Sequence, residues 1–84
     1  MRVVEDIVQR VEVNPDIMVG KPVIKGTRIP VDLIVKLLGE GLNIEEILKD
    51  YPQLSETDVK AALLYASKVL SGEQVFPILQ GETR

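Results

Sequence analysis

Glycine and proline alternate between residues 20 and 30 of this chain, and they restrict its fold more than any other feature. Proline removes a backbone donor and glycine weakens regular structure, so no helix can run through residues 17–29. The segment is therefore expected to be a loop with one or two short extended pieces. Four residues are expected to shape it: Gly20, Pro22, Gly26 and Pro30.

After this segment, apolar residues recur at helical spacing in three stretches. The first helix is predicted over 30–39, because proline is tolerated in the first helical turn and glycine follows at the end. The second, 44–51, and the third, 56–70, each follow a capping residue, Asn43 or Ser55, with an acidic residue three positions later. This is the layout of a helix-turn-helix core, although any small helical bundle has a similar pattern.

The N-terminal part is less regular. Val11 and Val13 alternate with Arg10 and Glu12, which predicts a short β-strand over about 9–13, and Asn14-Pro15-Asp16 predicts a turn after it. We therefore expect one mainly α domain over residues 1–84, with its core at about 9–71 and a C-terminal tail at 72–84.

Composition excludes several classes of function. An 84-residue chain buries only about 60 to 65% of its unfolded surface, so a homodimer is expected. The chain contains no cysteine and no histidine, which excludes disulfides, zinc-finger ligation and imidazole bases. We expect no enzyme activity, no cofactor and no metal. With no signal-peptide pattern and no apolar run near the ~20 residues of a membrane span, a cytoplasmic location is expected.

The glycine- and proline-rich segment is also locally basic. Three cations, Lys21, Lys25 and Arg28, lie between Asp16 and Asp32 with no acidic residue among them, in a chain of net charge -3. A phosphate-binding P-loop is excluded, because the Gly-Lys-Ser/Thr order is absent. Two interpretations stay open: solvated cations on a shaped loop, or a directed contact from Arg28 to an anion.

The start of the third predicted helix is the position that enters the major groove in DNA-reading proteins of this layout. Thr57 and Lys60 are therefore candidate contacts. Glu56 and Asp58 lie at the same place, and two carboxylates facing phosphates oppose groove insertion unless one accepts from a cytosine amino group.

The tail contains a short apolar patch formed by Val75, Phe76, Ile78 and Leu79 around a proline. One interpretation packs the only phenylalanine back onto the domain. The other makes the patch an anchor for a partner protein, in particular a toxin.

Two runs carry a resemblance to a known family. GKPVIKGTRIPV at residues 20–31 and GLNIEEILKDYPQL at 41–54, together with Asn14-Pro15, resemble the domain-of-unknown-function family 433 over about residues 9–67. That family looks like a group of small VapB-type antitoxins. The resemblance implies a homeodomain-like or winged-helix-like three-helix fold with a short N-terminal strand region, and a PIN-like nuclease toxin as partner. It supplies no catalytic residues.

The function expected from these observations is that of an antitoxin-like protein that neutralises a PIN-like toxin and binds its own operator DNA. Two alternatives stay open. One is a stand-alone DNA-binding regulator, and the other is a protein interaction module with no role in nucleic-acid binding.

Overall fold

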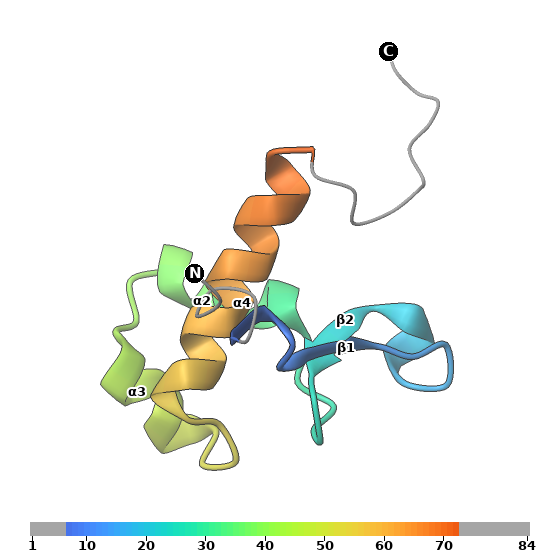
Figure 1. The fold of residues 1–84 in the computed structure, drawn as a ribbon. Helices are drawn as coiled ribbons and strands as arrows, with labels where there is room; N and C mark the ends of the chain where they lie inside the picture. Colours follow the sequence, from blue (N-terminus) through green and yellow to red (C-terminus); the bar gives the residue numbers. More distant parts are fainter. Residues whose placement is uncertain (1–6, 73–84) are drawn as a thin grey trace.

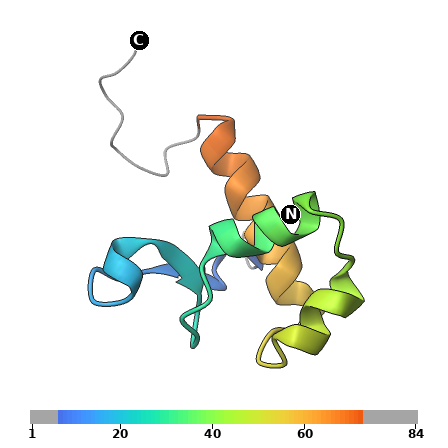
Figure 2. The same ribbon diagram turned by 180° about the vertical axis from the view of Figure 1, so that it is seen from behind.

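The structure is a computed structural model that describes residues 7–72. Its elements in chain order are β1 (Val11–Val13), the 3-10 turn η1 (Met18–Gly20), β2 (Pro22–Ile24), α2 (Val31–Gly39), α3 (Ile44–Asp50) and α4 (Glu56–Leu70). Figures 1 and 2 show α4 running through the middle of the molecule, with the strands on one side and α3 on the other. Within residues 7–72, three α-helices and a two-stranded antiparallel sheet confirm the predicted mainly α fold.

The two strands form a hairpin. Val11 lies opposite Ile24 and Val13 lies opposite Pro22. β1 is thus the C-terminal part of the strand predicted over 9–13. Pro22 is tolerated because a two-stranded sheet consists of edge strands, where a missing N–H need not break a ladder bond.

The connection between the strands begins with the predicted turn and continues in an unusual backbone conformation. The amide of Asp16 donates to Asn14 Oδ1 at 2.8 Å, as in an Asx turn. Met18 and Val19 then have φ of 51° and 57°, a region that non-glycine residues rarely adopt. Val19 is 94% exposed, so no side-chain packing compensates for its backbone strain.

The helix boundaries differ from the predicted ones by one residue at two places, both next to prolines. α2 begins at Val31, because Pro30 is extended (φ −74°, ψ 148°) and serves as the N-cap. α3 ends at Asp50, because Tyr51 leaves the helix (φ −127°, ψ 75°) before Pro52. A residue that precedes proline avoids the α region, because the proline ring would clash with it.

Both predicted capping boxes are present. The amide of Glu46 donates to Asn43 Oδ1 at 2.9 Å, and Glu46 Oε1 accepts from the Asn43 amide at 2.9 Å. The same exchange joins Ser55 and Asp58 at 3.2 and 2.9 Å. α4 covers the residues predicted for it, Glu56–Leu70. These boxes satisfy amides that a helix start otherwise leaves unpaired.

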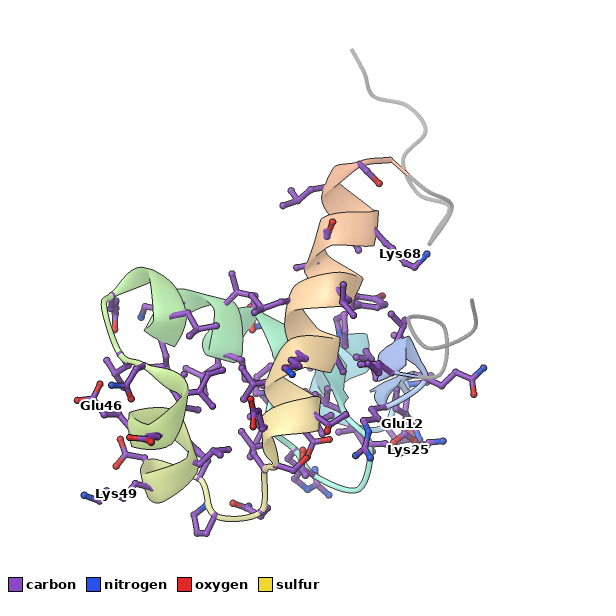
Figure 3. All side chains as sticks on the ribbon, turned by 60° about the vertical axis from the view of Figure 1, so that its left-hand side comes forward. Glu12, Lys25, Glu46, Lys49 and Lys68 are labelled. Atoms are coloured by element: carbon purple, nitrogen blue, oxygen red, sulfur yellow. The ribbon has the colours of Figure 1, made fainter. Side chains whose placement is uncertain are left out.

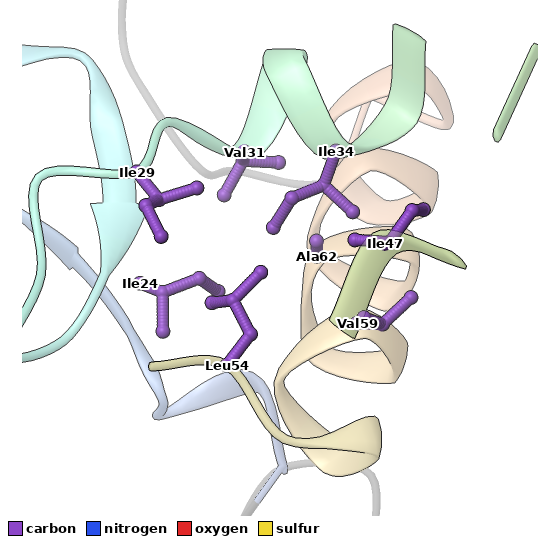
Figure 4. Packing of buried hydrophobic residues seen from close by; sticks show 8 residues of the cluster. All are labelled: Ile24, Ile29, Val31, Ile34, Ile47, Leu54, Val59 and Ala62. Atoms are coloured by element: carbon purple, nitrogen blue, oxygen red, sulfur yellow. The ribbon is translucent and has the colours of Figure 1, made fainter. Parts of the chain in front are cut away.

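The buried cluster of the described residues is aliphatic, with Tyr51 and Tyr65 packed against it, and Figure 4 shows how its members meet between the hairpin and the helices. The cluster draws on the second strand, the segment after it, all three helices and the α3–α4 connection: Ile24, Ile29, Val31, Ile34, Ile47, Leu54, Val59 and Ala62. Each fully buried aliphatic side chain contributes about 1.5–3 kcal/mol. The hairpin is thereby part of the core and is held against the helices.

The last turns of α4 extend beyond this core. Leu63, Val69 and Leu70 are 41%, 45% and 86% exposed, although they continue the apolar spacing of the helix. The buried residues of α4 all lie between Asp58 and Ala62. The C-terminal half of α4 therefore presents apolar surface that residues 7–72 do not cover.

Candidate functional site

A tight turn follows β2 and carries two of the candidate cations. The amide of Thr27 donates to the Ile24 carbonyl at 2.9 Å, and Gly26 has φ of +83°. Turns with positive φ at this position select glycine. A Cβ added at Gly26 meets no atom within 4 Å, so backbone conformation, and not space, requires glycine here. We call residues 25–28 the cationic turn.

Thr27 stabilises the cationic turn from inside. Its hydroxyl donates to the Ile24 carbonyl at 2.7 Å and accepts from the Ile29 amide at 3.0 Å. The Ile24 amide also donates to the Ile29 carbonyl at 3.0 Å, and Pro30 pairs with Val23 before α2 begins. The threonine is therefore occupied by backbone partners, and Lys25 and Arg28 are left exposed on either side of it.

An ion pair connects the cationic turn to the start of α4. The amide of Lys25 donates to the Arg10 carbonyl at 2.7 Å, which places Arg10 beside the turn. Arg10 Nη1 in turn donates to Asp58 Oδ1 at 3.0 Å. Sequence reasoning missed Arg10, because its partner is distant in the chain and only the hairpin brings the two together.

The prediction that both Glu56 and Asp58 present carboxylates to a ligand is wrong for Asp58. That side chain is 10% exposed, and its two oxygens accept from Ser55 and Arg10. The capping-box geometry turns the third residue of a helix back toward the N-cap. Glu56 alone remains outward, 3.8 Å from Lys60.

The cationic turn and the start of α4 lie at the same end of the molecule. Figure 3 shows Lys25 on the hairpin side, at the level of the first turns of α4, and Lys68 at the level of its last turns. Among residues 7–72, Lys25 and Arg28 form no ion pair, and Lys60 pairs only with the exposed Glu56. Thr57 is half-buried in the first turn of α4. With the Arg10 charge balanced by Asp58, this end of α4 presents exposed positive charge.

Lys21 is separate from this group. It lies at the opposite end of β2 from Lys25, about 13 Å along an extended chain. Its Nζ pairs with Asp32 Oδ2 at 3.2 Å, beside the start of α2. The structure thus assigns Lys21 a local ion pair and not a place in the cationic turn.

Of the four residues expected to shape the segment, Gly20 has φ of +82° and closes the 3-10 turn.

A second feature is a groove between α2 and the C-terminal half of α4, next to Pro22 of β2. Its volume is about 410 Å³, and apolar side chains form most of its surface. Tyr65 lies in it, and desolvation by burial raises the pKa of the Tyr65 hydroxyl. We call this feature the apolar groove. The sequence signal for it is the apolar spacing of α4 that continues beyond the core.

Other predictions concern parts or properties beyond this geometry. The tail residues Val75, Phe76, Ile78 and Leu79 lie outside the described residues. Within residues 7–72, no group of three acidic side chains is placed to hold a metal ion. The same range contains no helix long and apolar enough to cross a membrane.

Comparison with known proteins adds relatives of this chain. The family described as "Protein of unknown function (DUF433)" matches residues 11–66. The uncharacterized protein y4eO of Sinorhizobium fredii is 36% identical over 53 residues, which are 63% of this chain and 24% of that protein. An uncharacterized protein of Archaeoglobus fulgidus is 62% identical over 29 residues, 34% of this chain and 81% of that protein. The chain therefore spans about a quarter of the length of the Sinorhizobium relative.

A solved structure is also similar. The crystal structure of a DUF433 member protein from Anabaena variabilis superimposes with a TM-score of 0.71 at 29% sequence identity. The match covers 81% of this chain and 67% of that chain. The hairpin, the cationic turn, α2 and α3 lie within the residues matched by the family, and the match ends inside α4, at residue 66.

Proposed function

The chain belongs to the DUF433 family, and on that basis we propose that it is an antitoxin-like protein that neutralises a PIN-like nuclease and binds its own operator DNA. The observation that carries the DNA-binding part is the unpaired positive charge of the cationic turn beside the start of α4. The proposal includes a cytoplasmic homodimer. It assigns no catalytic step to the chain.

The geometry supports an approach of DNA to this end of the molecule. In helix-turn-helix proteins the second helix of the motif enters the major groove with its N-terminal residues. Here α3 and α4 are those two helices, with Thr57 and Lys60 on the first turns of α4. Lys25 and Arg28 would then contact the flanking phosphates, where arginine makes two parallel bonds to oxygen.

The number of cations limits the strength of this contact. If Lys25, Arg28 and Lys60 each neutralise one phosphate, log K falls against log salt with a slope of about −2.7 per chain. A homodimer doubles that value. The acidic net charge of -3 disfavours binding elsewhere on the surface, so DNA contact is expected to depend on this one end.

The DNA-binding part is tested by fluorescence anisotropy with a duplex from the region upstream of the gene. Arg28→Gln and Lys25→Gln should each weaken binding and reduce the salt slope by about one unit per chain. Lys68→Gln, a change of the same charge at the other end of α4, is the matched control and should bind like wild type. Equal affinities for all three variants would contradict the proposal.

The antitoxin part is tested with the product of the adjacent reading frame. The two proteins should copurify, and coexpression should restore growth that the neighbour alone arrests. Absence of both effects, with a folded protein, would remove the antitoxin role and leave a stand-alone DNA-binding regulator if the anisotropy result holds.

One observation favours a second candidate function. The apolar groove provides surface for a protein partner and lies away from the cationic turn. A protein interaction module without a nucleic-acid role would use this groove alone. Loss of partner binding in a groove variant, together with no measurable DNA binding, would identify that function.

A further inference from the structure

The apolar groove has few unsatisfied polar groups to offer a ligand. Two charged residues border it, Asp32 and Lys36. Asp32 pairs with Lys21 at 3.2 Å and Lys36 pairs with Glu40 at 3.7 Å. The rest of its surface is mainly apolar, including Val35, Ala66 and Val69. A fitting occupant is therefore apolar and needs no charge of its own.

The walls of the groove also restrict how an occupant binds. They are formed mostly by α2 and α4, whose backbone groups bond within their own helices. An occupant thus gains little from backbone hydrogen bonds and must bind through its side chains. A cavity of about 150 Å³ accommodates one benzene ring, so the groove volume of about 410 Å³ has room for two or three large apolar side chains.

We propose that the occupant is the apolar segment of the same chain, residues 75–79. That segment, Val-Phe-Pro-Ile-Leu, has four apolar side chains besides its proline and no charge. It begins five residues after Leu70, which lies at the C-terminal end of the groove. Five residues span at most about 17 Å, enough to bring Phe76 over Ala66.

The end of α4 directs the chain suitably for this contact. Gly72 has φ of +84°, and its amide donates to the Val69 carbonyl at 3.1 Å. A left-handed glycine after a helix ends the helix and changes the direction of the chain. The Val69 and Leu70 side chains, 45% and 86% exposed, are the nearest apolar surface for such a contact.

A segment of the same chain also has an advantage over one from another molecule. A short connection holds it near the groove at an effective concentration in the millimolar range. The contact would cover the apolar surface of α4 in the free protein. A partner that binds Phe76 or the groove would then have to displace it. This inference depends neither on DNA binding nor on a toxin.

The test uses the absence of tryptophan from the chain. Phe76→Trp introduces a single fluorophore into the segment, and Thr83→Trp provides the matched reference near the end of the chain. Each is measured in the full chain and combined with Ala66→Arg, which blocks the groove, or with Ser67→Arg, which adds the same charge to the exposed neighbouring position. Circular dichroism checks that each variant is folded.

We expect the Phe76→Trp emission to be shifted to shorter wavelength than that of Thr83→Trp, at all protein concentrations. The shift should be lost with Ala66→Arg and kept with Ser67→Arg. Emission equal to that of Thr83→Trp would overturn the proposal, as would a shift that survives Ala66→Arg in a folded protein. A shift that appears only as concentration rises would assign the groove to a second copy of the chain and also overturn it.

Discussion

Replacement of Asp58 by alanine is expected to destabilise the protein strongly, because this one side chain joins the two parts of the candidate site. It caps α4 through the Ser55 amide at 2.9 Å. It also accepts from Arg10 at 3.0 Å, and Arg10 in turn lies against the cationic turn. Asp58→Ala removes both contacts and leaves the Arg10 guanidinium without its partner.

The expected magnitude follows from these two contacts. A hydrogen bond to a charged group contributes about 1.5–3 kcal/mol, and the Ser55 contact is of this kind. The Arg10 contact is weaker, about 0.5–1 kcal/mol, because the Arg10 side chain is 48% exposed. Asp58→Ala should therefore lower the free energy of unfolding by about 2–4 kcal/mol, which corresponds to a Tm lower by roughly 10–25 °C in a domain of this size.

The measurement is a double-mutant cycle by urea unfolding with Arg10→Ala, Asp58→Ala and the double variant. Arg10→Ala alone should cost about 0.5–1 kcal/mol, and it should cost almost nothing once Asp58 is absent. Asp58→Asn keeps an acceptor for the Ser55 amide and should lie between wild type and Asp58→Ala. An equal cost of Arg10→Ala with and without Asp58 would refute the idea that this pair holds the hairpin to α4.

Three further predictions concern backbone conformation and burial. Gly26→Val should lower the free energy of unfolding by about 1–3 kcal/mol, because residue 26 has a positive φ. Gly39→Ala, in a helix with open space around it, should instead raise it by up to about 1 kcal/mol. Equal Tm values for the two variants would contradict this prediction. Val19→Asn should stabilise by about 0.5–1 kcal/mol, since asparagine tolerates a left-handed backbone better than a β-branched residue, and an unchanged or lower urea midpoint would argue against strain at this position. Burial raises the pKa of Tyr65 above its ordinary 10.0, so the folded state favours the neutral hydroxyl. The contribution of Tyr65 to the free energy of unfolding is therefore fully present below pH 10, and it is lost as pH rises through the folded pKa. When unfolding is measured from pH 9 upward, Tyr65→Phe should lose less free energy of unfolding than wild type. Identical pH profiles for the two proteins would exclude the effect.

The helices could be predicted from sequence because their signals are local. Asn43 and Ser55 satisfy amides within the next three residues, so the cap, the acidic residue and the helix start lie in one short window. The two boundaries that differ, at Pro30 and Pro52, involve the choice between helical and extended backbone in a single residue. At a helix start, proline permits both helical and extended backbone, and the neighbouring chain determines which of the two is adopted.

The candidate site was predictable only in part. Lys25, Arg28, Thr57 and Lys60 are named by the sequence, and the structure places the cationic turn and the start of α4 at one end of the molecule. Lys21 does not join them, because β2 holds it at the other end of the strand with Asp32. The Arg10–Asp58 pair was also missed, because the residue spacing predicted the contact of Asp58 with Ser55 but does not show which partner its other oxygen finds in space.

By itself, the sequence determined the mainly α class, the three helices, the turn at Gly26 and the family, because each depends on neighbours within a few residues or on one continuous run. Only the tertiary structure decided that Arg10 meets Asp58 across 48 positions and that the end of α4 forms a groove with α2. Those contacts arise from how the hairpin and helices pack around Ile24, Ile34 and Val59. Packing depends on the shapes of distant side chains, which no local pattern encodes.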